Sequence, residues 1–291
     1  MLQATELAYS TLTALVRSLG EAAPTDSGSQ QDLERLLRAA SRAIDRHCNR
    51  SFLRESLTET VMGDGSPHLL LSRTPIVQLS SIVFQSSPLI GATIEDADAG
   101  LLYYAPGFGD TRGYGLHLTQ HAQPDWDTRD YSVTYVGGYL LPPQNMVSRT
   151  LSVSAAQSAY LDSAGLFPLL VPGDLVLAAG FTTPANNGLK IVVSRTASVL
   201  VVNATLVDEG APAASADPRQ LDVSTLPSEV EQACLETAKA WWVARDRDPA
   251  ARSVSVGDLS VTYEGGATPG AMPQAMPFGA LALLAPWARV V

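Results

Sequence analysis

Two histidines four positions apart, His117 and His121, are the first candidates for chemistry in this sequence. On a helix, this spacing points both imidazole rings to one face, where they can bind zinc. Asp125 and Asp127 follow closely and would add carboxylate ligands. The surrounding residues alternate between apolar and polar types, which predicts a strand or loop, and there the two rings do not converge. We therefore expect neither a metal site nor a cofactor.

The sequence offers little else for catalysis. Asp96 and Asp98 stand two positions apart, but the further ligands of a calcium-binding loop do not follow at the required spacing. The chain contains no phosphate-binding loop, no GxGxxG motif and no GxSxG motif. Because no nucleophile can be paired with a base, we do not expect an enzyme. A metal-dependent enzyme that uses the two histidines is kept as a distant alternative.

Four arginines at helical spacing predict a basic stripe along one helix, namely Arg35, Arg38, Arg42 and Arg46. Three interpretations of this stripe remain open. It could face solvent, with pairs such as Glu34–Arg38 inside the helix. It could form salt bridges to a neighbouring subunit, or it could bind nucleic acid.

A short apolar segment, 278–284, follows a linker rich in Gly, Pro and Met. A helix of about two turns has little core of its own, so it either packs on its parent domain or docks into a partner. We expect docking, because exposed apolar patches usually mark interaction sites. The candidate docking residues are Phe278, Leu281, Leu284 and Trp287.

Composition narrows the class of protein. Only 16% of the 291 residues are charged, against about 25% in globular proteins, which favours a subunit partly covered by other copies. The net charge of −10 argues against a protein that grips duplex DNA by its phosphates. We expect no signal peptide and no membrane-spanning helix, since no long apolar run occurs. Cys48 and Cys234 are expected to be buried free thiols.

Helical periodicity is strongest over 30–49 and 228–247. Ser29 with Asp32, and Ser228 with Glu231, predict capping-box starts for these two helices. The first helix has a clear apolar face, made of Leu33, Leu36, Leu37, Ala40, Ala43, Ile44, His47 and Cys48. We expect the two helices to pack together, with Trp241 in their core.

The remaining sequence predicts strands. Between the two helices we expect strands at 56–61, 69–71, 76–84, 101–104, 116–118, 131–136, 175–178, 189–195 and 199–203. Asn186-Asn187-Gly188 predicts a tight hairpin, and a further strand is expected at 259–263.

The predicted fold is α+β, with a helical bundle core, a β-rich region and an inserted all-β domain. Residues 143–225 are poorer in charge than the rest of the chain and lie between two similar Leu-Pro strings, which indicates an insertion. The expected domains are 1–142 with 226–291, interrupted by a small β-domain at 143–225. A linker and docking segment occupies 264–291.

Several strings resemble the head–tail connector (adaptor) family of tailed bacteriophages. They are AASRAIDRHCNRSF, GDGSPHLLLSRTPIVQLSSI, YSVTYVGGYLLP, LPSEVEQACLETAKAWWVARDRDP, VGDLSVTYEGG and MPFGALALLAPWARVV, in this order. The resemblance covers about 1–142 and 226–291. The segment 143–225 departs from it and is similar instead to small β-domains of phage tail-tube proteins.

The resemblance implies a structural protein of the virion neck, assembled in the host cytoplasm. Its copies would form a ring, usually a dodecamer, that binds beneath the portal, extends the DNA channel and receives tail-side neck proteins. DNA would pass without specific binding. The basic stripe would then face solvent or the next subunit. Alternatives are a tail terminator or tube-associated protein, suggested by the inserted segment, and a DNA-binding module that uses the arginines.

Overall fold

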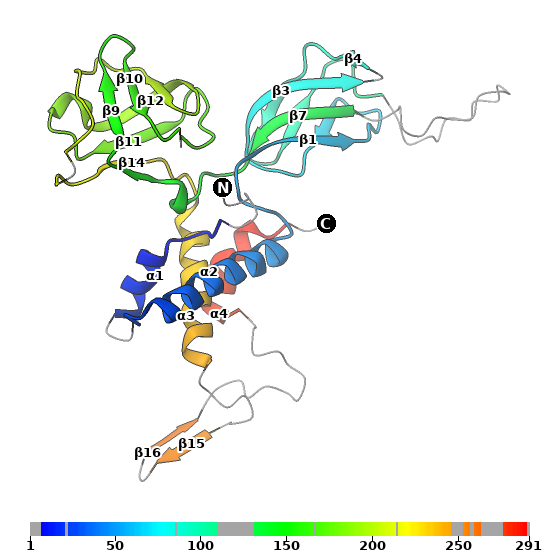
Figure 1. The fold of residues 1–291 in the computed structure, drawn as a ribbon. Coiled ribbons are helices and arrows are strands. Elements are labelled where there is room, and N and C mark those ends of the chain that lie inside the picture. The colour runs from blue at the N-terminus through cyan, green and yellow to red at the C-terminus, as the bar shows by residue number, and fades with distance from the viewer. Residues whose placement is uncertain are drawn as a thin grey trace. The chain divides into compact units, whose positions relative to one another are not determined.

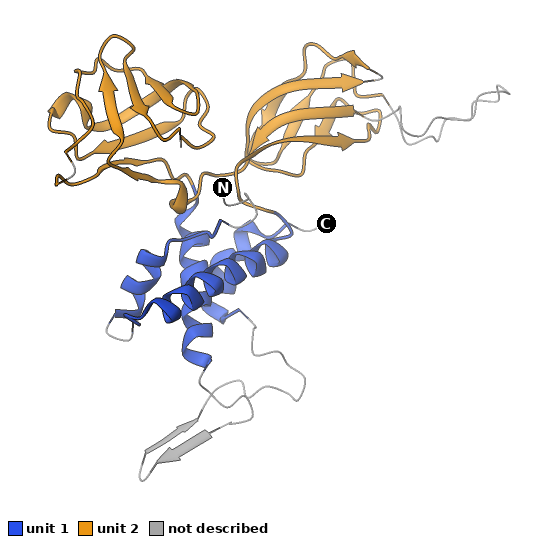
Figure 2. Ribbon diagram, in the orientation of Figure 1, with its two compact units in different colours: residues 1–50, 226–291 blue, residues 51–225 orange. Residues whose placement is uncertain are grey.

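A computed structural model describes residues 7–20, 23–84, 86–109, 131–165, 167–213, 215–245, 253–256, 259–262 and 276–289. The chain divides into two compact units, one formed by Met1–Arg50 with Leu226–Val291 and one formed by Ser51–Thr225 (Figure 2). We call them unit 1 and unit 2. The predicted strand at 116–118 and the residues His117, His121, Asp125 and Asp127 lie outside the described residues.

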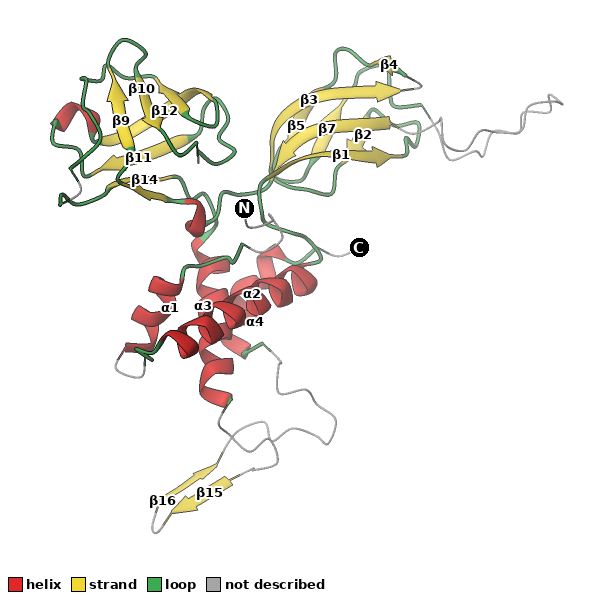
Figure 3. Cartoon of the chain, in the orientation of Figure 1, coloured by secondary structure: helices red, strands yellow, loops and turns green. Residues whose placement is uncertain are grey.

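Unit 1 contains the α-helices of the described chain (Figures 1 and 3). They are α1 (Leu12–Leu19), α2 (Ser27–Cys48), α3 (Ser228–Ala244) and α4 (Phe278–Leu284), followed by a 3₁₀ turn at Ala285–Trp287. The strands β15 (Ser253–Val256) and β16 (Leu259–Thr262) pair antiparallel in the same unit. The predicted bounds of α4 are confirmed, and Gly20 is the C-cap of α1.

The long helix α2 begins earlier than its sequence suggested. Asp26 is its N-cap and accepts a hydrogen bond from the Ser29 N–H at 2.8 Å, so the predicted start at Ser29 and Asp32 is wrong. His47, which we placed on the apolar face, is exposed. Asn49 ends the helix in the left-handed conformation. The buried face is therefore narrower than predicted and consists of Leu33, Leu37, Ala40, Ser41, Ile44 and Cys48.

Helix α3 packs against α2, α1 and α4, so the two long helices meet as predicted. The capping box expected from Ser228 and Glu231 is absent, because Pro227 is the N-cap and makes no side-chain bond. Glu231 instead accepts a hydrogen bond from the Ser10 hydroxyl at 2.9 Å. Trp242 is buried, whereas Trp241, which we expected in the core, is only half-buried.

The first part of unit 2 consists of two sheets over one core. One sheet has the order β1-β7-β3-β4 and the other β2-β6-β5. Their strands are β1 (Glu55–Val61), β2 (His68–Leu70), β3 (Ile76–Phe84), β4 (Ser87–Pro88), β5 (Thr93–Asp96), β6 (Leu101–Tyr103) and β7 (Tyr131–Gly137). The inward side chains of β7 (Tyr131, Val133 and Tyr135) lie in the shared core, as the alternation in its sequence predicted.

The end of β7 requires glycine at Gly138. Its φ is +99°, a region that side chains with a Cβ rarely adopt, and an added Cβ would lie 2.5 Å from the Leu53 carbonyl oxygen. The close approach lets Tyr139 and Arg54 pair, with the Arg54 N–H donating to the Tyr139 carbonyl at 2.8 Å.

The second part of unit 2 is one seven-stranded sheet, β8-β14-β11-β12-β13-β10-β9. Its strands are β8 (Met146–Ser148), β9 (Leu151–Ser154), β10 (Ala159–Asp162), β11 (Leu175–Ala179), β12 (Gly188–Arg195), β13 (Val199–Val202) and β14 (Arg219–Asp222), with 3₁₀ turns at Pro142–Gln144 and Pro184–Asn186. The sheet encloses a core of its own, which includes Tyr160, Val176 and Leu200. All seven strands fall inside the segment 143–225 that the sequence set apart.

The two ends of this segment lie side by side. The Leu140 N–H donates to the Thr225 hydroxyl at 2.9 Å, and the Thr225 N–H donates to the Leu140 carbonyl at 2.9 Å. The chain thus leaves β7 and returns at nearly the same point, which is the geometry of a domain carried on a loop.

The fold combines helices with sheets and is therefore α+β. From the sequence we expected 51–142 to belong with the helices, whereas the structure places these residues in unit 2 with 143–225. The physical reason is that the described residues of 51–139 form a sandwich core of their own. Among the helices that the structure describes, none has both the length and the apolar character required to cross a lipid bilayer.

Candidate functional site

The contact between α2 and α3 is organised by one buried serine. The Ser41 hydroxyl donates to the Leu37 carbonyl at 2.8 Å and accepts from the Tyr9 N–H at 2.9 Å. The Cys234 sulfur lies 3.5 Å from the same hydroxyl. Small side chains at Ser41 and Cys234 let the two helices approach closely, and a larger residue at either position would separate them.

Both cysteines are buried and free, as predicted. Burial raises the pKa of the Cys48 thiol to about 11 and that of Cys234 to about 12. Because only the thiolate is nucleophilic, these thiols are inert at neutral pH. They fill space in the helical unit and do no chemistry there.

The basic stripe on α2 divides into two halves. Arg35 pairs with Asp32 at 2.8 Å, and Arg38 lies 4.0 Å from Glu34, so the N-terminal half is balanced by acids of its own helix. Arg42 and Arg46 are exposed, and neither forms a salt bridge to another described residue. The Arg46 Nε donates to the Arg42 carbonyl at 3.3 Å. Only the C-terminal half of the stripe therefore keeps its charge available to a partner.

The predicted docking segment packs on its own unit. In α4, Ala280 and Leu284 are buried, and α4 contacts α3. The Arg289 N–H donates to the carbonyl of Cys48 at 3.0 Å, which satisfies an acceptor at the end of α2. Leu284 is thus part of the internal core and is not a docking residue in this conformation. Phe278 differs, because 86% of its surface is exposed. Leu281 and Trp287 are half-buried.

A buried ion pair that the sequence did not suggest joins the two parts of unit 2. The Arg54 Nη1 lies 2.6 Å from Asp174 Oδ2, and the two side chains are only 4% and 9% exposed. Arg54 Nε also donates to the Gly138 carbonyl at 3.2 Å, and Asp174 accepts from the Val171 N–H at 2.8 Å. The sequence around each residue does not mark it as buried, and the two partners lie 120 positions apart.

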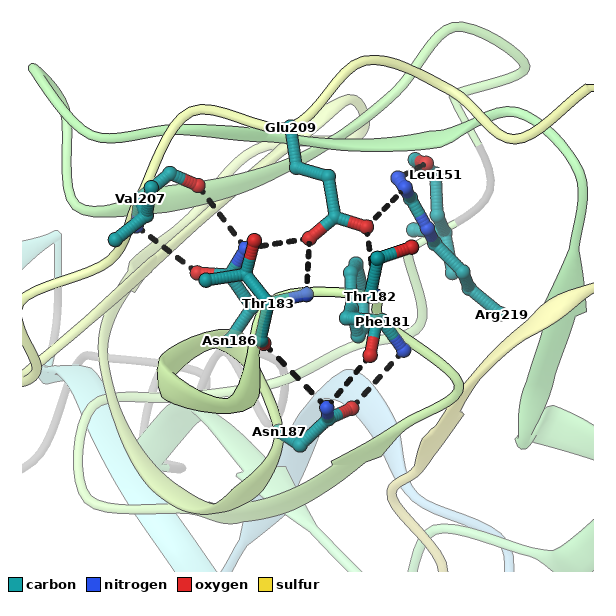
Figure 4. Close-up of polar contacts among 9 residues, drawn as sticks. All are labelled: Leu151, Phe181, Thr182, Thr183, Asn186, Asn187, Val207, Glu209 and Arg219. Atoms are coloured by element: carbon teal, nitrogen blue, oxygen red, sulfur yellow. Dashed lines mark hydrogen bonds and ion pairs between the residues drawn. The ribbon is translucent and has the colours of Figure 1, made fainter.

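A second buried network surrounds Glu209 (Figure 4). One carboxylate oxygen lies 2.5 Å from Arg219 Nη2 and accepts from the Thr182 N–H at 2.9 Å. The other accepts from Asn186 Nδ2 at 2.8 Å and from the Thr183 N–H at 3.2 Å. Arg219 also donates to the Leu151 carbonyl at 2.6 Å. The Glu209 carboxylate thus holds together its own segment, the loop at 180–187 and strand β14.

Electrostatics explains how the Glu209 carboxylate stays charged. Burial alone would raise its pKa, but the hydrogen bonds from Thr182, Asn186 and Thr183, with the charge of Arg219, outweigh this and lower the pKa. All four lone-pair sites of the carboxylate have donors nearby, which leaves no position for a substrate. The network stabilises the fold, and its geometry offers no reactive group.

The predicted tight hairpin at Asn186-Asn187-Gly188 is wrong. Eight residues, 180–187, connect β11 to β12, and Asn186 is fully buried within them. Its side chain donates to the Val207 carbonyl at 3.0 Å and accepts from the Val207 N–H at 2.9 Å. Asn187 accepts from the Phe181 N–H at 3.0 Å. The two asparagines therefore serve as internal hydrogen-bonding groups, a role that turn statistics do not distinguish from a type I′ hairpin.

No catalytic arrangement is evident in the described parts of the chain. A pocket of about 350 Å³ next to β8 is lined by Pro143, Gln144, Asn145, Met146, Val147, Ser148 and Pro168, none of them charged. Within the same described ranges, no three His, Cys, Asp or Glu side chains come together as metal ligands. Asp96 ends β5 and accepts from the Ala99 N–H, as in an ordinary surface turn.

Comparison with known proteins does not assign the chain to a family. Neither the models of known protein families nor the curated protein sequences give a match.

Proposed function

We propose that this chain is a head-to-tail adaptor of a tailed bacteriophage, a structural subunit of the virion neck. Its copies form a ring beneath the portal, extend the DNA channel and receive tail-side neck proteins. Genomic DNA passes through the ring without being bound specifically, in keeping with the net charge of −10.

One observation carries this proposal. Two of the strings that resemble the adaptor family lie mainly on α2 and α3, which pack against each other through Ser41 and Cys234, 193 positions apart. They form one helical unit that also holds α1 and α4. In the proposal, this helical bundle is the wall of the ring, and the sheet of 146–222 lies on the outside, where a loop-borne domain does not disturb the wall.

The charged half of the arginine stripe supplies the contact between subunits. Arg42 and Arg46 are exposed on α2 without an acidic partner among the described residues. In the ring they pair with carboxylates of the next copy. The double variant Arg42→Glu/Arg46→Glu should lower the mass of the assembly in sedimentation velocity. Arg35→Glu is the matched control, because Arg35 is equally exposed but already balanced by Asp32. An unchanged mass for the double variant would remove this contact from the proposal.

Phe278 is the residue through which we expect the portal to dock. It is 86% exposed at the start of α4, whereas Ala280 and Leu284 of that helix are buried and the helix contacts α3. Truncating the segment would remove Leu284 from the core, so a point change is the better test. Phe278→Asp should preserve the ring and abolish stacking on the portal. Ile90→Asp is the control, since Ile90 is 85% exposed in unit 2.

The decisive experiment mixes purified protein with its portal and images the product by negative-stain microscopy. A ring stacked on the portal supports the adaptor function, and absence of any ring contradicts it. Stacking that survives Phe278→Asp would contradict only the docking site.

A tail terminator or tube-associated protein is the second candidate, because the seven-stranded sheet suits a tube-type domain. That function predicts binding to the end of the tail tube and none to the portal, so the same mixing experiment with purified tube separates the two. A DNA-binding module predicts retardation of duplex DNA at low salt that Arg42→Glu/Arg46→Glu removes.

A further inference from the structure

The outer face of β11 and β12 is apolar and uncovered within the part of the chain that the structure describes. Successive outward positions along these two strands carry aliphatic side chains that are 46% to 62% exposed, namely Leu175, Leu177, Leu189, Ile191 and Val193. We call these five residues the aliphatic face. Their inward neighbours, such as Val176 and Val192, fill the core of the sheet.

The strand register makes the aliphatic face continuous. Leu175 is directly opposite Ile191, and Leu177 is directly opposite Leu189, in antiparallel pairs. Cross-strand neighbours of this kind have Cβ atoms about 5 Å apart, so the four side chains form one block. Val193 extends it along β12, where the register shifts between Val192 and Ser194.

Single exposed aliphatic residues are common on protein surfaces, but a paired block is not. From their exposed fractions, the five residues present roughly 450 Å² of solvent-accessible surface. The largest apolar patch on a typical monomer covers ~300–600 Å² and is often functional. A sheet face of this kind is normally covered by another layer of structure.

The charge of this face is compatible with a second copy of the same face as the covering layer. None of the five residues is charged, so two copies can meet without repulsion between like charges. Lys190 points to the other side of β12, where its Nζ donates to the Ala185 carbonyl at 3.0 Å. Asp222, opposite Leu177 on β14, is half-buried, and its carboxylate accepts from the Ser224 N–H at 3.2 Å.

The area also fits a second copy. Two aliphatic faces in contact would bury about 900 Å² from these side chains alone, and flanking residues such as Ala179 and Gln220 would bring the total to about 1,000–1,200 Å², the lower limit of specific interfaces. Sheet faces stack at about 10 Å in β-sandwiches, and β11 and β12 of two copies could meet at this spacing. An interface of this size gives a reversible dimer.

We therefore propose that the aliphatic face of β11 and β12 is a self-association site, which pairs with the same face of a second copy of this chain. Such a contact has two-fold symmetry, and a simple cyclic ring contains no two-fold axis within it. The pairing would thus join two rings or two free chains. The inference does not rest on the adaptor function.

The first test compares assembly masses of the full chain by sedimentation velocity over a range of concentrations. Leu177→Asp/Leu189→Asp should halve the largest mass that the unaltered chain reaches. Val207→Asp is the matched control, because Val207 is 45% exposed in the loop between β13 and β14, and it should leave the mass unchanged. Equal masses for the double variant and the unaltered chain would overturn the proposal. Circular dichroism of each variant establishes that it is folded.

The second test does not depend on a disruptive substitution. Leu175→Cys, Leu177→Cys, Leu189→Cys and Ile191→Cys are made singly and exposed to a mild oxidant. Cys48 and Cys234 are buried and add no background. At least one variant should give a disulfide-linked dimer faster than Val207→Cys. If all four match that control, or if the face binds only a different surface of the chain, the same-face pairing is wrong.

Discussion

Leu140 and Thr225 exchange two hydrogen bonds of 2.9 Å although they are 85 positions apart. Each residue supplies both a donor and an acceptor, so the two chain segments are held together independently of the sheet between them. The seven-stranded sheet is therefore an inserted domain whose two ends are hydrogen-bonded to each other. This arrangement accounts for a change in composition that the sequence shows at both ends of the segment.

Removing the sheet should leave the remainder folded. We expect a chain in which two glycines replace 141–224 to keep its helical circular dichroism and a cooperative thermal transition. The variant also needs Leu140→Ser and Arg54→Met, because Leu140 belongs to the lost core and Arg54 loses Asp174. A deletion of the same length at 121–204 removes β7 from the first part of unit 2 and β8 to β13 from the second part. This variant should not fold. Loss of cooperativity in the first variant would show that the sheet is required by its neighbours.

The ion pair between Arg54 and Asp174 should be costly to break from one side. Arg54→Met leaves Asp174 buried without its cation and should destabilise the protein by about 3–5 kcal/mol in urea unfolding. Adding Asp174→Asn removes the stranded charge, so the double variant should be more stable than the sum of the single losses implies. Additive losses would mean that water reaches the pair. Arg35→Met, at an exposed pair, should cost less than about 1 kcal/mol.

Glu209 should make stability depend on acidity. Its carboxylate has a lowered pKa in the folded chain, so its contribution is fully present above the unfolded-state pKa near 4.5 and is lost as pH falls through the lower folded value. Glu209→Gln should cost about 1–3 kcal/mol at pH 7, and the difference from the unaltered chain should shrink below pH 4. Urea unfolding at pH 7, 5 and 3.5 measures this. Asp217→Asn, at an exposed site of the same domain, should show no such trend.

The two cysteines should be unreactive in the native protein. With pKa values of about 11 and about 12, Cys48 and Cys234 carry almost no thiolate at pH 8. A colorimetric thiol reagent should label fewer than about one in ten within an hour, and should label both at once in concentrated guanidinium. Rapid labelling of Cys234 without denaturant would indicate that α2 and α3 separate readily. Phe278→Cys provides an exposed thiol for comparison.

The sequence predicted those helices and strands in which apolar residues recur at a regular helical or strand spacing. The bounds of β3 and α4 agree with the sequence, and the apolar alternation of Tyr131, Val133 and Tyr135 identified a central strand. Several short strands were not predicted. One of them is β14, whose sequence RQLD resembles a polar loop. It is a strand because β11 and β8 pair with it, and Arg219 can point inward because Glu209 neutralises it.

The buried polar contacts could not be predicted either, because local sequence does not show which distant residue a side chain will contact. Arg54 and Asp174 are separated by 120 positions, and nothing in their neighbourhoods marks either as buried. Asp26 became the cap of α2 although Ser29 was an equally good candidate, because both side chains can accept from a backbone N–H. The tail was expected to dock elsewhere because an apolar helix gives no sign of which core it joins. In the structure, Leu284 joins its own unit.

The bond from Arg289 to Cys48 has a consequence for synthesis on the ribosome. Helix α2 is translated roughly 180 residues before α3, and the donor for its carbonyl at Cys48 is Arg289, the last residue that the structure describes. At about 5–20 residues per second, the apolar face of α2 remains without α3 for roughly 10–40 seconds. Unit 2 is complete during that interval and can fold first. The nascent chain thus carries an amphipathic helix whose apolar face is still partly exposed, which is the kind of segment that chaperones recognise.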